Sequence, residues 1–414
     1  MRPSIILLSA LCLPAAALAQ SLPDAISFDD VIDIAYQANP RAALDRQEIA
    51  LARADRTTAG AYPNPKASYD GEYQPGEQTN FSSRKAHNVG LEIPLLLGGQ
   101  RRARIEAAER GIYAAEARVT ASNINRAVEA GAAYIGLLVA QEKLAVLHER
   151  QKEFGRLQEL VKGRQAAGMA SEYDLLRIDV EGAAWRTEIG EAKADLAGRQ
   201  GQLAALLGFE HWRPRGTSKL RPWRVALPKA YDEFLAEHPS LTAARRDETY
   251  ARANVETARR ERFPEVSLNA GRFWTESPYG ATTSVGLTVE LPLFDTREGG
   301  VQKAEAEARS AALRRRLVEA EVEADVVKYA AQMRERSAAL ANYRTNVEPR
   351  LSNLKRMAED SYKLRGGTVV DLLDATRTRI ESKINGLELI GNLMEAELRY
   401  QAARGEISAL LSDR

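Results

Sequence analysis

The chain repeats one structural plan twice, at an offset of 197 to 199 residues. In each half a dipeptide ending in proline opens a helical stretch, alternating segments follow, and a very long stretch rich in alanine, glutamate and arginine comes after them. The matching landmarks of the two halves are Pro40 and Pro239, Pro65 and Pro264, Pro94 and Pro292, and Asp174 and Asp371. Self-similarity at a fixed period predicts a duplicated architecture. Each half should therefore combine strands with very long helices.

Four short segments, two in each half, alternate apolar and polar residues: 67–74, 88–93, 267–271 and 284–291. A period of two is typical of strands with one apolar and one polar face. The apolar face needs a cover, which is either helices packed on two hairpins or the lipid around an outer membrane barrel. Since about eight strands are the minimum for a closed barrel, several chains would have to share one.

Each strand pair leads into a very long helix. Residues 101–162 contain no proline, and residues 302–364 contain only Pro349, for which the pattern offers no reason. Apolar residues recur at spacings of three, four and seven, as in coiled coils. In the second long helix they are Leu340, Tyr343, Val347, Leu351 and Leu354. Glycines end both long helices, and we expect helices over 171–207 and 368–411 to return along them.

The chain begins like an exported protein. Arg2 precedes a short apolar core, and small residues lead to Ala19, which together predict a signal peptide over 1–19. The one cysteine, Cys12, lies inside this leader, and the bulky Leu11 before it disfavours lipidation. No other apolar run reaches the roughly 18 residues of a transmembrane helix. The remaining parts are a first strand–long-helix repeat over 20–207, a proline-rich connector over 208–237 and a second repeat over 238–414.

Charge and motifs exclude several classes of function. Without Arg2 the chain carries 57 basic and 57 acidic residues, so nothing favours nucleic acid as a partner. No phosphate-binding loop, nucleophile triad or catalytic carboxylate pair stands out, and we expect neither enzymatic activity nor a cofactor. The histidines, at positions 87, 148, 211 and 238, do not have metal-ligand spacing, so no metal site is predicted.

Over nearly the whole mature length the chain resembles the TolC family of outer membrane channels. Its most specific segment is 362–375, a glycine turn followed by Asp, two apolar residues and Asp-Ala. Residues 164–176 look like the first-half counterpart, although Arg177-Ile178 stands where Asp-Ala would. Residues 97–105 and 291–300 look like the cobalt–zinc–cadmium, CzcC-like, branch of the family.

The resemblance implies a mainly α fold with a small β part, made of duplicated long-helix coiled-coil hairpins and four strands per chain. It also implies a homotrimer with a 12-stranded outer membrane barrel on an α-helical periplasmic tunnel. The implied partners are a periplasmic adaptor, or membrane fusion protein, and an inner-membrane pump of the resistance–nodulation–division type. The implied cargo is divalent heavy-metal cations. Multidrug export or type I protein secretion would use the same conduit.

Two sets of candidate residues lie at the glycine turns. Small residues there offer either contacts for adaptor helices or simple turn chemistry: Gly168, Met169, Ala170 and Ser171 in the first half, and Gly366, Gly367 and Thr368 in the second. Asp174, Asp371 and Asp374 follow the turns, where rings of carboxylates in a trimer would select cations or, with Arg365, latch the tunnel. The alternative role of these carboxylates is helix capping. A competing class for the whole chain is a periplasmic coiled-coil scaffold or adaptor.

Overall fold

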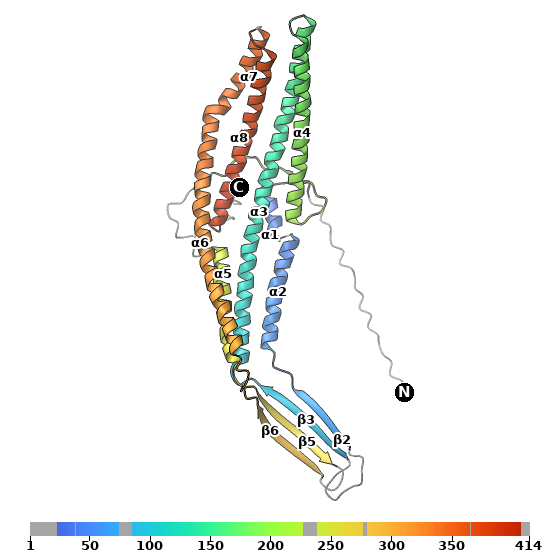
Figure 1. The fold of residues 1–414 in the computed structure, drawn as a ribbon, viewed down its shortest axis with the longest axis vertical. Coiled ribbons are helices and arrows are strands. Elements are labelled where there is room, and N and C mark those ends of the chain that lie inside the picture. Colours follow the sequence, from blue (N-terminus) through green and yellow to red (C-terminus); the bar gives the residue numbers. More distant parts are fainter. Residues whose placement is uncertain are drawn as a thin grey trace, which may run out of the picture.

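The computed structural model describes residues 23–37, 39–73, 85–226, 238–275, 280–364 and 366–406. The predicted signal peptide, with Cys12, and the candidate Arg365 lie outside these ranges. The molecule is an elongated array of helices with a four-stranded sheet at one end and two helical hairpin tips at the other (Figure 1).

The order of the elements repeats, as the duplicated landmarks predict. In each half a helix precedes a strand pair, a long helix follows, and a last helix returns along it (Figure 1). The first half contains α2 (Pro40–Gly60), β2 (Lys66–Tyr73), β3 (Lys85–Leu95), α3 (Gln100–Ala166) and α4 (Glu172–Leu207). The second contains α5 (Pro239–Arg260), β5 (Val266–Thr275), β6 (Ala281–Val289), α6 (Glu298–Asn342), the π-helical turn η1 (Tyr343–Val347), α7 (Glu348–Lys363) and α8 (Val369–Ala403).

The proline dipeptides start helices for a local reason. Asn39 is the N-cap of α2, where its side-chain oxygen accepts a hydrogen bond from the Arg41 amide at 2.8 Å. Its side-chain nitrogen donates to the Leu206 carbonyl at 2.9 Å, which ties α2 to the end of α4. Pro40 and Pro239 occupy first-turn positions, where the missing amide hydrogen costs nothing. Each dipeptide is therefore a helix start.

A small collar lies at mid-height of the helices. It contains α1 (Phe28–Gln37) and the parallel pair β1 (Ala25–Ile26) and β4 (Arg215–Gly216). The buried Tyr134 of α3 joins these segments, since its hydroxyl donates to the Ile26 carbonyl at 2.8 Å and accepts from the amides of Thr217 and Ser218 at 3.1 Å each. This collar is built on the largest apolar core in the described part of the chain.

One window of α3 is long and apolar enough to cross a membrane by length and composition, and this is found for no other helix in the described ranges. Half of that window is buried against other segments. It overlaps the collar core, where Tyr134, Leu137 and Leu138 are buried. We interpret this window as the core of the helical part.

The sheet has the strand order β2-β3-β5-β6 and is antiparallel throughout. Register places Leu91 beside Ala270, and Leu268 beside Leu287, on one face. The other face carries polar pairs, such as Asn269 with Thr288, whose side chains are hydrogen-bonded at 2.6 Å. The sheet extends beyond the helices and does not pack on them (Figure 1). The apolar face of a single chain is therefore bare.

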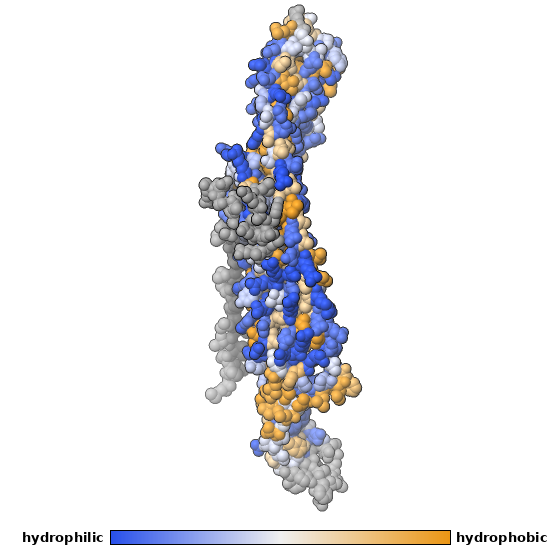
Figure 2. All heavy atoms as spheres, turned by 90° about the vertical axis from the view of Figure 1, so that its left-hand side faces the viewer, coloured by the Kyte–Doolittle hydropathy of each residue, from blue (hydrophilic) through white to orange (hydrophobic). Residues whose placement is uncertain are grey.

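Aromatic and apolar side chains lie at the two ends of this face. At the far end Tyr69 is hydrogen-bonded to His87 at 2.9 Å, and the His87 ring stacks on Trp274 with ring centroids 5.4 Å apart. At the near end hydrophobic residues gather at the junction with the helices, on the face seen in Figure 2. Its exposed residues include Leu97, Phe263, Leu291, Leu293 and Phe294. Apolar surface flanked by aromatic residues is typical of lipid-facing strands.

The structure supplies the reason for Pro349. The π-helical turn η1 lies directly before it, and the Glu348 amide donates to the Tyr343 carbonyl five residues back. A proline interrupts the regular hydrogen bonding of an α-helix, and a π-turn changes that pattern locally. Across the turn, the Tyr343 ring packs on Gly386 of α8, where an added Cβ would lie 2.5 Å from the ring.

Candidate functional site: the two hairpin tips

The first tip, between α3 and α4, is a compact helix-ending turn. Gly168 adopts a left-handed conformation with φ of 71°. Its amide donates to the Gln165 carbonyl at 2.9 Å, and the Met169 amide donates to the Arg164 carbonyl at 2.8 Å. These two bonds form a Schellman motif, which requires the left-handed residue. Gly168 is therefore a structural glycine, whereas Met169 is an exposed residue on the outside of the turn.

The second tip, between α7 and α8, uses its glycines differently. The amides of Gly366 and Gly367 both donate to the Ser361 carbonyl, at 3.0 and 3.1 Å. A Cβ on Gly367 would lie 2.8 Å from the Ser361 hydroxyl oxygen, whereas a Cβ on Gly366 would meet nothing closer than 3.6 Å. Gly367 is needed for close packing of the turn, and Gly366 is not.

Two of the three candidate aspartates are capping residues. Ser171 donates to the Asp174 carboxylate from its amide and its hydroxyl, both at 2.9 Å. Thr368 does the same to Asp371, at 2.9 and 2.7 Å. In return the aspartate amides donate to the hydroxyl groups, at 3.1 and 3.2 Å. These are two reciprocal capping boxes at equivalent places in the repeats. The hydrogen bonds from Thr368 lower the pKa of the Asp371 carboxyl.

The third candidate, Asp374, lies one turn further along α8. Its side chain is exposed, and no described residue holds it by a hydrogen bond or ion pair. The neighbouring Arg377 is engaged elsewhere, with Glu181 of α4 at 2.5 Å. Asp374 is therefore the candidate carboxylate that no hydrogen bond or ion pair with a described residue holds in place.

A contact that the sequence analysis missed ties the two tips together. The Arg164 guanidinium lies over the Tyr362 ring, 4.4 Å from its centroid, and donates to the Tyr362 carbonyl. Tyr362 is only 3 % exposed, and burial raises the pKa of its phenol. The offset between these two positions is 198 residues, the period of the duplication. This match with the period could have predicted the contact between Arg164 and Tyr362, because equivalent positions of paired hairpins can face each other.

Below the tips the hairpins share an apolar cluster and a set of ion pairs. The cluster includes Phe154, Leu157 and Val161 of α3, Ile178 and Trp185 of α4, and Val369, Leu372 and Leu373 of α8. The α3 carboxylate of Glu153 pairs with Lys355 of α7 at 2.9 Å and with the buried Arg379 of α8. Glu149 of α3 pairs with Lys383 at 3.3 Å. Separating the hairpins would break these contacts.

The described histidines lie on different segments: His87 on β3, His148 on α3, His211 in the connector, and His238 buried before α5. In the described ranges no group of three or more His, Cys, Asp or Glu side chains could hold a metal ion.

Long helical hairpins joined to a short sheet with a bare apolar face define the subunit of an outer membrane channel with a periplasmic helical extension. The chain belongs to the outer membrane efflux protein family, whose sequence model matches residues 31–209 and 230–409.

Individual proteins show the same relationship. The cobalt-zinc-cadmium resistance protein CzcC of Cupriavidus metallidurans is 26 % identical over 77 % of each chain. The nickel and cobalt resistance protein CnrC of the same organism is 27 % identical over 74 % of this chain and 73 % of its own. Among solved structures, CusC superposes with a TM-score of 0.78 over 92 % of each chain at 18 % identity. These comparisons confirm the predicted family, the mainly α fold and an outer membrane efflux channel.

Proposed function

We propose that three copies of this chain form the exit channel of a tripartite system that exports divalent heavy-metal cations. The observation that supports this cargo is that CzcC and CnrC, which align over most of their length, are both named for resistance to such metals. The implied partners are a periplasmic adaptor and a resistance–nodulation–division pump. The channel itself would conduct passively and use no cofactor.

The geometry of the sheet supports assembly. β2 and β6 are edge strands, and lipid offers no partner for their backbone groups. β2 and β6 run in opposite directions, so β6 of one copy can pair antiparallel with β2 of the next. Four strands per copy require at least two copies for a barrel of about eight strands. Three copies, giving 12 strands, are what the family resemblance implies.

Residues at the tips would serve contact and gating. We assign adaptor contact chiefly to the exposed Met169 and Gly366 and the half-buried Ala170, and a cation-selecting ring to Asp374. Arg365, which lies outside the described residues, would latch the tunnel closed together with the tip aspartates. The division into 20–207, 208–237 and 238–414 is also part of the proposal, and the two segments of the family match support a boundary between 209 and 230.

The adaptor contact is best tested with Gly366→Leu. A Cβ at position 366 meets only ordinary van der Waals contacts, whereas a Cβ at position 367 would lie 2.8 Å from the Ser361 hydroxyl oxygen. We expect lost efflux with trimers still present in the outer membrane. Gly155→Leu is the matched control, because Gly155 is an exposed α3 glycine with nothing within 4 Å. Normal efflux in Gly366→Leu would contradict the contact.

The cargo is tested by growth of a deletion strain on zinc, cadmium, cobalt, nickel and copper beside a panel of dyes and antibiotics. Selective sensitivity to the metals, restored by the intact gene, is expected. Sensitivity to organic compounds alone would retain the channel and reject the metal cargo.

A further inference from the structure

A cavity of about 750 Å³ lies between the connector and helices α6 and α8. Its floor is apolar and consists of Met333, Leu340 and Leu393, all at most 5 % exposed. Pro222 of the connector lies against one wall. A cavity of this size holds a group much larger than a single small ion.

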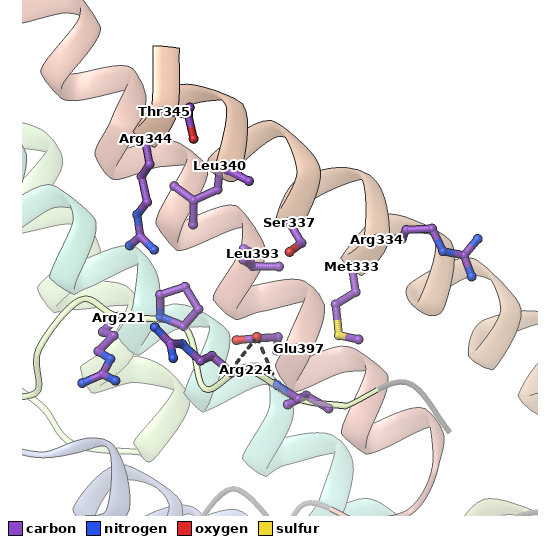
Figure 3. Close-up of a pocket in the computed structure, with 13 residues that line it drawn as sticks. Arg221, Arg224, Met333, Arg334, Ser337, Leu340, Arg344, Thr345, Leu393 and Glu397 are labelled. Atoms are coloured by element: carbon purple, nitrogen blue, oxygen red, sulfur yellow. Dashed lines mark hydrogen bonds between the residues drawn. The ribbon is translucent and has the colours of Figure 1, made fainter. Parts of the chain in front are cut away.

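Arginines surround this floor. Arg221 and Arg224 come from the connector, Arg334 comes from α6, and Arg344 comes from the π-helical turn η1. Figure 3 shows Arg221, Arg224 and Arg344 on one side of the cavity, while the Arg334 side chain points away from them. By contrast, Arg315 of α6 is paired with Glu248 and Glu319.

None of the four cavity arginines forms an ion pair with a described residue. Among the described residues that line the cavity, Glu397 is the only carboxylate, and its oxygens already accept hydrogen bonds. They accept hydrogen bonds from the amides of Trp223, Arg224 and Val225 at 2.8, 2.9 and 3.4 Å. The described lining of the cavity therefore has an excess of positive charge in a chain whose net charge is only +1.

The backbone is arranged to present one of these arginines. Arg224 has φ of 62°, a left-handed conformation that is unfavourable for a residue with a side chain. The 2 % exposed Glu397 fixes this conformation through the three amide hydrogen bonds. Backbone strain that the surroundings enforce tends to gather at ligand-binding sites.

We propose that this cavity binds an acidic peptide segment of a periplasmic protein, with carboxylates on Arg221, Arg224 and Arg344 and apolar side chains on the Met333–Leu340–Leu393 floor. Guanidinium groups bind carboxylates in a directed, often bidentate way. An apolar floor beside them favours a chain that alternates acidic and apolar side chains. The site lies outside the hairpin tips and goes beyond the channel function proposed above.

The position of the cavity argues against a lipid headgroup as the occupant. Met333 is 35 residues along α6 from its start at Glu298, next to the sheet. At 1.5 Å per residue this is about 50 Å from the membrane-facing strands. A headgroup in the outer membrane would not reach that far.

The test is fluorescence anisotropy on the purified full chain in detergent. The probe is a fluorescein-labelled peptide that alternates glutamate and leucine, compared with a matched glutamine–leucine peptide. We expect only the acidic peptide to bind, and Arg224→Gln and Arg344→Gln each to weaken it about tenfold, since each loses a charged hydrogen-bonding partner. Arg344 lies on the exposed face of a helix, so that variant should fold normally. Arg334→Gln is the control with the same loss of charge and should change affinity little.

Several results would overturn the proposal. Equal weakening by Arg334→Gln would mean general electrostatic attraction, and equal binding of the glutamine peptide would mean apolar adsorption. Full displacement of the peptide by inorganic phosphate at comparable concentration would mean a small-anion site. Absence of binding would reject the site. Metal resistance is not measured in this assay, so failure of the peptide site is distinguishable from failure of the proposed metal cargo.

Discussion

Replacing Thr368 with alanine separates the two roles considered for the tip aspartates. The Thr368 hydroxyl donates to Asp371 at 2.7 Å and accepts from its amide at 3.2 Å, so alanine removes both bonds. Loss of an N-cap side chain costs ~1 kcal/mol. If the first turn of α8 opens locally, this corresponds to about fivefold more opening, because 1.4 kcal/mol is tenfold.

Hydrogen exchange measured by mass spectrometry on the first turn of α8 reports this opening. The Leu372 amide, which donates to the Thr368 carbonyl at 3.3 Å, should exchange about fivefold faster in Thr368→Ala. Thr368→Ser keeps the hydroxyl and should behave like the native chain. Ser171→Ala should have the same effect in α4 and none in α8, because the two capping boxes are equivalent.

Ion selectivity supplies the second readout. Asp371→Asn should also speed exchange in α8, because it weakens the hydrogen bonds from Thr368, and it should leave the reversal potential in planar bilayers nearly unchanged. Asp374→Asn should leave exchange in α8 nearly unchanged and shift the reversal potential, since no described residue holds that carboxylate by a hydrogen bond or ion pair. A shifted reversal potential in Asp371→Asn with unchanged exchange would refute the capping role.

Three further predictions concern other contacts. Arg164→Gln removes the guanidinium from the Tyr362 ring and should raise single-channel conductance. Unchanged conductance would mean that this contact does not take part in gating. Gly386→Ala places a Cβ 2.5 Å from the Tyr343 ring and should destabilise the chain by about 1–3 kcal/mol in denaturant unfolding; no loss would mean that the ring relaxes freely. Burial lowers the pKa of His238 below its usual 6.5, so this side chain takes up a proton at higher pH in the unfolded chain than in the folded chain. The free energy of unfolding should therefore fall as pH drops below 6.5. His238→Asn should flatten that dependence in thermal unfolding between about pH 5 and 7.5, and an unchanged slope would exclude this histidine.

Sequence periodicity predicted the elements well because each has a strong local cause. The alternating segment 284–291 became β6 (Ala281–Val289), and the proline-free stretch 101–162 became α3 (Gln100–Ala166). The ends differ by a few residues because turn hydrogen bonds, rather than apolar spacing, set them. The Schellman motif at Gly168 is one such cause.

The candidate site was harder to predict because contacts between hairpins decide it. Asp174 and Asp371 could be proposed for either capping or gating, and only their hydrogen bonds show the capping. The Arg164–Tyr362 contact depends on how two helices from different halves pack, which composition and spacing do not specify. The arginine-lined cavity likewise joins residues more than 100 positions apart, as between Arg221 and Arg344.

The coiled-coil seam of the second long helix shows how one inserted residue changes the site. Continued at intervals of seven, the positions of Leu340 and Val347 predict a buried Leu354, which is wrong, because Leu354 is 38 % exposed. The π-helical turn η1 accommodates one extra residue and shifts the seam by one position. The half-buried or buried residues of α7 are Leu351, Lys355, Ala358, Glu359 and Tyr362.

The shift has a consequence at the tip. Without the π-turn, position 361 and not Tyr362 would lie in the seam and face the first hairpin. With it, the Tyr362 ring lies under Arg164, and Lys355 reaches Glu153. The unbroken α3 has 67 residues, whereas α6, η1 and α7 have 45, 5 and 16. The two halves therefore remain nearly equal in length. The π-turn sets the orientation of the residues that join the tips. This is a physical reason for Pro349 and η1 to occur in only one of the two repeats.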